Sequence, residues 1–489
     1  MVKKIIENIR KKDIDIYFMV VLLVVMLSYK QQISGTDVLW NFSNIYKMSI
    51  GYEIYKDLNV ILTPLFFYIG KILFNIFGQN FRTFVFYNFM IYTVFFGCIN
   101  VIFKELKINK SRRVAFILIL FLIFRTMLPV GANYNILAFI PILVSMILFL
   151  KKKENYLIHA ILVFITTMCK QNIGVFHGIG IVLYIIVQDD KKAENKIINI
   201  IKIGIVNIAL FMLFCFAYKS MGLLDDFIDM AFLGIGEFSK SNTFFNYYES
   251  LYFYLAILID IFLVYAVTSK KLNFEKNNVE IKNNIKTLIC FGTPMIFIGI
   301  PIANSFHSVL SGLIVSIAFF YTIENMILND MKIKRAYLVN VIIILFLISR
   351  TAYDIIKSNE YIYTDKESPY YGGYILKENR EKIENICEFI IENNNHKINV
   401  IVLSKDANMF MTPLKKANRE FDLPFLGNLG KKGEDGLIEK IKSLNNTKIL
   451  IRKDEEKTFW QESKKVEKYV KENYINIGEI EEYNIFYIR

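Results

Sequence analysis

The stretch that decides the fold runs from Ser34 to Phe77 and reads SGTDVLWNFSNIYKMSIGYEIYKDLNVILTPLFFYIGKILFNIF. It follows the first apolar segment, and it places an acid, Asp37, where a membrane-spanning chain would leave the lipid. The apolar and aromatic residues after Asp37 predict an amphipathic helix that lies on the membrane surface and holds the acid close to it. We therefore interpret residues 34–81 as a candidate active-site loop at the outer membrane face.

Composition places the rest of the chain in a membrane. The 489 residues are 54% hydrophobic and 15% aromatic, and apolar blocks alternate with short Lys-rich breaks. About 20 apolar residues are needed to cross a bilayer core as a helix. The sequence therefore predicts a polytopic α-helical membrane protein, with apolar blocks at 16–33, 60–77, 82–103, 114–128, 133–150, 156–170, 172–187, 197–218, 250–268, 287–302, 307–325 and 336–352.

The net charge of +13 does not indicate a nucleic-acid partner. The Lys and Arg residues lie mainly in the breaks between apolar blocks, where they are typical topology signals. The first block follows a basic start and lacks a small-residue cleavage site, which predicts a retained span in the cell membrane with a cytoplasmic N-terminus. Four of the five cysteines lie in or beside apolar blocks, so neither a disulfide framework nor metal-ligand spacing is expected.

The topology depends on whether residues 60–77 cross the membrane. If they do, the basic breaks fall outside, against the positive-inside rule; if they dip into the interface and return, every break becomes cytoplasmic. The second arrangement gives about eleven spans, with residues 34–81, 129–132, 219–249, 303–306 and the neighbourhood of Gln171 outside. A true span, offset by a re-entrant segment elsewhere, remains the alternative.

From about residue 358 the composition becomes charged and mixed. The runs INVIVLS, TKILIRK and IEEYNIFYIR are typical of strands, and residues 378–392, 437–444 and 460–473 have helical spacing. We expect a transmembrane domain over 1–357 and a small extracytoplasmic α/β domain over 358–489. The glycines of GNLGKKGEDG do not follow a strand as a phosphate-binding loop would, and we interpret them as turn residues.

Ionisable groups near span ends are candidate functional residues because charge at membrane depth is costly. Asp37 is the candidate acid, although a solvated loop acid is the alternative. Arg82, Arg125 and Lys170 fall at the outer ends of predicted spans, where they either reach lipid headgroups or bind a lipid phosphate.

Further candidates lie near the same predicted face. His307 follows Asn304 in PIANSFHS, and the two would form a polar pocket, unless the histidine is structural. Tyr134, in GANYN, would line the same pocket or cap the next span.

These segments resemble the GT-C superfamily of membrane glycosyltransferases, which includes protein O-mannosyltransferases and lipid A aminoarabinose transferases. The family pattern is a first span with a cytoplasmic start, then an outer loop that opens with an acid, an aromatic helix, a Gly-x-x-x-Tyr-x-Asp-like stretch and a Pro-Leu-x-x-Tyr helix. Here these appear as GTDVLWNFSNIYKMSIGYEIYKD and TPLFFYIG. The segments CKQNIG, PIANSFHSVLSG and FDLPFLGNLGKKGEDG are also similar to segments of bacterial members.

The resemblance implies sugar transfer from a polyprenyl-phosphate donor to a cell-envelope glycan or lipid acceptor at the outer face. Asp37 corresponds to the general base, and Lys170 and Arg82 would stabilise the leaving phosphate. Some members use a divalent metal, Mg or Mn. Asp37 has no second acid adjacent to it, which argues against this, and Asp229 and Glu237 are weak candidate ligands. The remaining candidate substrate contacts are Tyr55, Asp57 and Gln171.

Two other functions remain open. A transporter or flippase of lipid-linked sugars is expected to show internal repeats and broken spans in matching halves, and no clear repeat is present. A structural or assembly protein whose outer domain binds envelope polymers would need neither Asp37 nor cations at the outer span ends.

Overall fold

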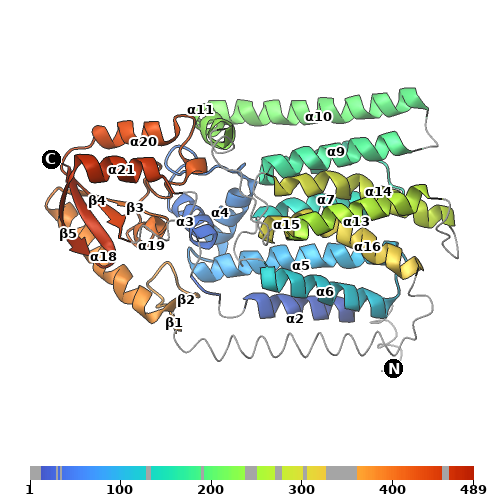
Figure 1. Ribbon diagram of the computed structural model, residues 1–489, viewed down its shortest axis with the longest axis horizontal. Helices are drawn as coiled ribbons and strands as arrows, with labels where there is room; N and C mark the ends of the chain where they lie inside the picture. Colours follow the sequence, from blue (N-terminus) through green and yellow to red (C-terminus); the bar gives the residue numbers. More distant parts are fainter. Residues whose placement is uncertain are drawn as a thin grey trace. The chain divides into compact units, whose positions relative to one another are not determined.

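The protein is mostly helical and forms two compact units, each described here by itself (Figure 1). The helical unit comprises Met1–Tyr29, Asn88–Leu213 and Thr243–Lys357, and the mixed unit comprises Lys30–Tyr87, Phe214–Asn242 and Ser358–Arg489. The computed structural model describes residues 13–28, 31–33, 36–127, 134–188, 192–236, 251–269, 278–300, 305–326, 361–453 and 462–488.

Every predicted apolar block that falls on described residues contains a helix, and block 336–352 lies outside them. In the helical unit, α14 packs against α7, α9, α13 and α16, and α8 packs between α7 and α9. The helices are α2 (Ile14–Ser28), α5 (Phe81–Glu105), α6 (Lys110–Met127), α7 (Tyr134–Leu150), α8 (Tyr156–Cys169), α9 (Gln171–Val187), α10 (Ala193–Ser220), α13 (Leu251–Thr268), α14 (Asn278–Ile296), η2 (Phe297–Gly299), α15 (Ser305–Ser311) and α16 (Leu313–Met326). The first residues of α5 and the last of α10 belong to the mixed unit.

Three of the described helices, α5, α10 and α13, are long and apolar enough to cross a membrane. Helix α10 also exposes large apolar side chains along its length, among them Ile205, Ile208 and Met212. Apolar surface of this kind is stable against lipid and costly in water. A membrane protein is therefore compatible with the structure, but the expected count of eleven spans is not confirmed, because the other apolar helices are shorter than a bilayer requires.

Ion pairs gather several basic breaks at one end of the helical unit. Asp13, which precedes α2, accepts hydrogen bonds from both terminal nitrogens of Arg113 and pairs with Lys104 at 2.9 Å. Lys107 at the end of α5 pairs with Glu280 of α14 at 2.6 Å. The start of α2 and the end of α5 therefore lie at the same end of the helical unit.

Within residues 60–77, only α4 (Leu65–Phe77) is helical. At 1.5 Å per residue its 13 residues span about 20 Å, less than the roughly 30 Å of a bilayer core. Phe66, Phe67, Gly70 and Phe74 form its buried face, and the chain before Pro64 is not helical. A short helix with one face in protein fits an interfacial segment better than a span.

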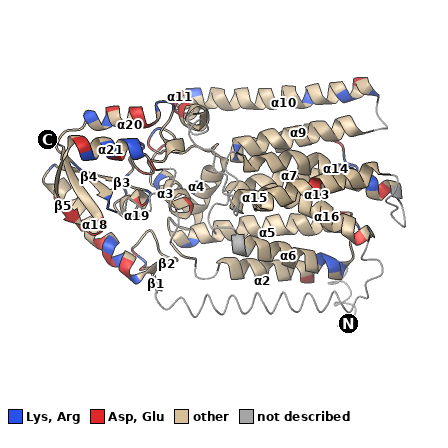
Figure 2. Cartoon of the chain, viewed as in Figure 1, with Lys and Arg blue, Asp and Glu red and all other residues tan. Residues whose placement is uncertain are grey.

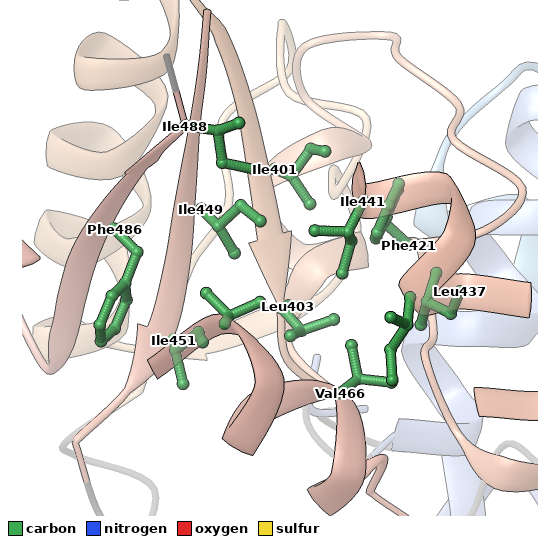
Figure 3. Close-up of a cluster of buried hydrophobic side chains, with 12 residues drawn as sticks. Ile401, Leu403, Phe421, Leu437, Ile441, Ile449, Ile451, Val466, Phe486 and Ile488 are labelled. Carbon is green, nitrogen blue, oxygen red and sulfur yellow. The ribbon is translucent and has the colours of Figure 1, made fainter. Parts of the chain in front are cut away.

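The mixed unit is built around a four-stranded sheet of order β3-β4-β6-β5, in which β3 and β4 are parallel and the other neighbours antiparallel. Its strands are β3 (Asn399–Leu403), β4 (Thr447–Arg452), β5 (Ile475–Ile480) and β6 (Tyr483–Ile488). Ile401, Ile449 and Ile451 of the sheet pack against Ile441 of α20 (Gly433–Lys442) and Val466 of α21 (Lys464–Asn473) (Figure 3). The small C-terminal sheet domain is thereby confirmed.

Charged side chains are more frequent in the helices of the C-terminal segment than in those of the helical unit. Lys, Arg, Asp and Glu cover α18 (Lys377–Asn395), α20 and α21, whereas α7 and α13 are almost entirely uncharged (Figure 2). The charged helices have one apolar face, which lies on the sheet. This is the pattern expected of a water-exposed domain, and it contrasts with the apolar helices of the other unit.

The mixed unit also contains further elements, some within the predicted tail domain and some from outside residues 358–489. These are α3 (Thr36–Ser49), α4, α11 (Leu224–Ile228), the π-helix η1 (Asp229–Leu233), α19 (Ala407–Met411), η5 (Leu426–Asn428) and a hairpin of β1 (Tyr361–Tyr363) with β2 (Tyr374–Leu376). The loop 34–81 therefore forms one compact unit with residues 358–489. Strands β1, β2 and β5 are short or exposed and carry little apolar alternation, so the sequence did not reveal them.

Candidate active-site loop and lysine cluster

Helix α3 is where its sequence predicts a helix, but it is not a surface helix. Every residue from Val38 to Met48 is buried, the polar ones included. The expectation that Leu39, Trp40 and Phe42 face lipid is therefore wrong for this structure. An apolar stripe looks the same in sequence whether lipid or protein covers it, and here protein does.

The polar side of α3 is held by a buried ion pair. Lys47 Nζ lies 2.6 Å from Asp422 Oδ2, with side-chain exposures of 0% and 1%. The ammonium also donates to Asn408 Oδ1 at 3.0 Å, and Ser43, one turn earlier, donates to the same oxygen at 2.8 Å. Thr412 donates to the Ser43 hydroxyl at 2.7 Å. Two neighbouring turns of the loop helix are thus bound to the C-terminal segment.

Burial acts against both charges of this pair. It lowers the pKa of Lys47, opposed by the nearby Asp422 carboxylate, and it raises the pKa of Asp422, opposed by Lys47. A backbone hydrogen bond from Asn418 to Asp422 Oδ2 at 3.0 Å further favours the carboxylate. A buried pair of this kind is stable only as a pair, because either charge alone would be costly to bury.

Asp37 lies in the first turn of α3 and is exposed. The carboxylate is favoured there by the helix dipole. Because the residues that follow are buried and hydrogen-bonded, the acid stands on a rigid element and not on a free loop. That is the support a reacting group needs.

Arg82 is exposed in the first turn of α5, and its backbone is fixed by the C-terminal segment. Its amide donates to the carbonyl of Tyr371 at 2.8 Å. A Cβ at Gly372, which has a φ of +95°, would lie 2.7 Å from Arg82 Cα. The close approach requires glycine at position 372.

Tyr55 and Asp57 hold the loop together. Tyr55 has a positive φ of 67° and no exposed surface, its hydroxyl donates to the carbonyl of Leu62 at 2.6 Å, and its ring packs edge-on against Phe227. Asp57 accepts a hydrogen bond from the amide of Glu53 at 2.8 Å. In this structure both residues act on the loop itself, and a substrate contact by either stays a prediction.

In the helical unit, Lys170 occupies the junction of two helices. Its extended backbone ends α8 and forms the N-cap of α9. Lys170 Nζ donates to Asn135 Oδ1 at 2.6 Å and lies 5.4 Å from the centroid of the Tyr134 ring. Its charge also acts on the imidazole of His307. The structure thus brings Tyr134 and Lys170 together. The sequence predicts Tyr134 and His307 for one pocket and Lys170 as a phosphate contact, and a pocket shared by Tyr134 and His307 stays a prediction.

For the other predicted substrate contacts and metal ligands, the structure gives a position in the fold but fewer contacts, or the side chain lies outside the described residues. Gln171 is the first residue of α9, half-buried beside Lys170. Arg125 lies in the last turn of α6, and its side chain is outside the described residues, as are Asn304 and Glu237. Asp229 lies in the mixed unit, where it accepts hydrogen bonds from Arg419 at 3.0 Å and from the backbone of Lys431 at 2.9 Å.

The side chains that could bind a metal ion are dispersed among the described residues. No group of three or more His, Cys, Asp and Glu side chains lies close enough together in these segments to bind an ion. Asp229, one of the two weak candidate ligands, instead faces a guanidinium. A divalent metal therefore stays a prediction of the resemblance.

Sequence reasoning missed the residues that anchor the loop. Lys47 is the only charged residue within the apolar part of α3, and it follows Ser43 at one-turn spacing. That pattern signals a polar partner for one side of the helix, but it does not identify Asp422, 375 positions away. Comparisons of the chain with protein-family models, with curated proteins and with solved structures found no match.

Proposed function

We propose that this protein is a membrane glycosyltransferase that moves a sugar from a polyprenyl-phosphate donor to a cell-envelope glycan or lipid acceptor. The observation that carries the proposal is the position of Lys170 with Asn135 and Tyr134, here called the Lys170 cluster. A lysine that precedes a helix N-terminus adds its charge to the positive end of the helix dipole, and both attract phosphate groups. Asn135 accepts a hydrogen bond from the Lys170 ammonium, which also lies over the Tyr134 ring.

The proposed chemistry is a single displacement at the anomeric carbon. The acceptor oxygen forms a bond to that carbon while the bond from the carbon to the phosphate oxygen breaks, and the polyprenyl phosphate leaves with the bonding electrons. Negative charge develops on the leaving phosphate, where Lys170 would stabilise it. The acceptor hydroxyl proton passes to Asp37, the proposed general base, and Arg82 is a second candidate phosphate contact.

The proposed sidedness follows from charge. The ion pairs of Asp13, Lys104 and Arg113 place the start of α2 and the end of α5 together, which supports one common side for the N-terminus and the basic breaks. Cytoplasmic placement of that end follows from the positive-inside rule. We propose that the C-terminal segment and the loop that bears Asp37 work at the extracytoplasmic face.

The test uses the full-length protein in lipid nanodiscs with a panel of undecaprenyl-phosphate hexoses and pentoses. Release of free undecaprenyl phosphate is measured with and without an oligosaccharide acceptor. We expect Asp37→Asn to lower transfer by about 100-fold or more, the usual contribution of a general base. Lys170→Gln should also weaken binding of undecaprenyl phosphate itself.

Matched controls separate these roles from general charge effects. Asp225→Asn removes an exposed acid of α11, and Lys202→Gln removes an exposed lysine of α10; neither should change turnover. Full activity of folded Asp37→Asn would exclude Asp37 as the base. A second assay uses the protein in lipid vesicles. If the donor crosses the vesicle bilayer without losing its sugar, the protein is a transporter of lipid-linked sugars instead.

A further inference from the structure

The mixed unit contains a cavity of about 320 Å³. Its lining residues do not include Asp37, and Lys170 belongs to the helical unit. The cavity volume is at the lower end of the range of small-molecule sites. The η1 segment contributes one wall, and the segment from Arg419 to α20 contributes the rest. The lining residues are Asp229, Met230, Arg419, Glu420, Asn428, Leu429, Lys431, Lys432, Gly436, Leu437 and Lys440.

The wall of the cavity is tightly built. Arg419 pairs with both Asp226 and Asp229, so its guanidinium ties α11 and η1 to the C-terminal segment. Gly430 has a φ of +67°, and a Cβ there would lie 2.6 Å from Asp229 Oδ2. The wall itself is a π-helix, a rare element that is frequent at functional sites.

The charges around the cavity are unbalanced in favour of cations. Four cations line it against two acids, and Asp229 is already bonded by Arg419 and by the amide of Lys431. Lys432 is paired with Glu439 at 2.9 Å. The described residues offer no carboxylate in ion-pair distance of the ammonium groups of Lys431 and Lys440, which leaves two cations for a ligand.

We infer that this cavity binds an oxyanion carried on a sugar chain. Lys431 and Lys440 would pair with the anion, while the half-buried Leu429 offers apolar surface to the carbon–hydrogen face of a sugar ring. A uronate carboxylate and a phosphodiester share this chemistry. The inference rests on the proposed function, because the ligand would be the acceptor polymer, held by the unit that also carries Asp37.

The test measures binding without any transfer reaction. Full-length protein in nanodiscs is titrated with three fluorescent oligomers of equal length: an oligogalacturonate, a glycerol-phosphate oligomer and a neutral glucan. We expect the acidic oligomers to bind more tightly than the glucan and to weaken with salt. The charge-reversed variant Lys431→Glu/Lys440→Glu should bind them at least about tenfold more weakly, since two attractive contacts become repulsive.

Matched variants make the result specific. Lys366→Glu reverses an exposed lysine between β1 and β2, outside the cavity, and should bind like the unmodified protein. Asp37→Asn should bind normally even if it abolishes transfer, so failure of the proposed function is distinguishable from failure of this site. Preference for one acidic oligomer identifies the anion. Equal binding of all three oligomers, no binding, or unchanged binding in Lys431→Glu/Lys440→Glu overturns the inference.

Discussion

Lys47 shows how one residue determines what covers a helix. A lysine with no exposed surface requires a buried partner, and Asp422 supplies it at 2.6 Å. The net contribution of such a pair to stability is small, because the desolvation of both charges offsets their attraction. Its effect is on specificity, since no other face of α3 can be presented to Asn408 and Asp422 without leaving a charge unpaired.

The first prediction is that the two halves of this pair are strongly coupled. Lys47→Met or Asp422→Leu alone should destabilise the mixed unit by about 3–5 kcal/mol, because each leaves a buried charge without its partner. The double variant should cost less than the sum, as seen in the unfolding free energies. Lys56→Met is the control: its 2.8 Å pair with Glu53 is exposed, so the unfolding free energy should hardly change. If the double variant lost as much stability as the two single variants together, the coupling would be contradicted.

At the scale of elements, the position of Lys170 depends on how closely α8 and α9 approach. Gly174, in the first turn of α9, faces the preceding helix so closely that a Cβ would lie 2.5 Å from Thr167 Cα. The obstacle is backbone and not a flexible side-chain tip. Any side chain at this position must therefore push the two helices apart, at the junction that holds Lys170.

The second prediction is that Gly174→Ala weakens phosphate binding at the proposed site around Lys170, although Gly174 is not itself a proposed phosphate contact. Separation of α8 and α9 should destabilise the helical unit by about 1–3 kcal/mol, the usual cost of overpacking. It should also weaken undecaprenyl-phosphate binding. Gly204→Ala on α10 is the matched control, because nothing lies within 4 Å of its Cβ position. That variant should be neutral or stabilised by up to about 1 kcal/mol. Equal melting temperatures for the two variants would contradict the role of Gly174.

At the scale of the whole molecule, the sequence was informative wherever contacts are local. Apolar blocks predicted the helices, and β-branched runs predicted β3 and β4. It was uninformative where the partner is remote. The contact of Lys47 with Asp422 and that of Arg419 with Asp229 join segments far apart in the chain, and periodicity within one helix carries no record of its partner.

The last prediction decides whether protein or lipid covers α3. Removal of residues 358–489 deletes Asn408 and Asp422, so the amides of α3 should lose their protection from hydrogen exchange, whereas those of α9 and α14 in the helical unit should keep it. The comparison uses the full chain and the truncated chain in the same nanodiscs, with Lys366→Glu as a control that retains the C-terminal segment. Persistent protection of α3 after truncation would mean that the bilayer can replace the C-terminal segment, as the amphipathic pattern alone suggests. Loss of protection would mean that the acid at Asp37 is positioned by residues more than 300 positions further along the chain.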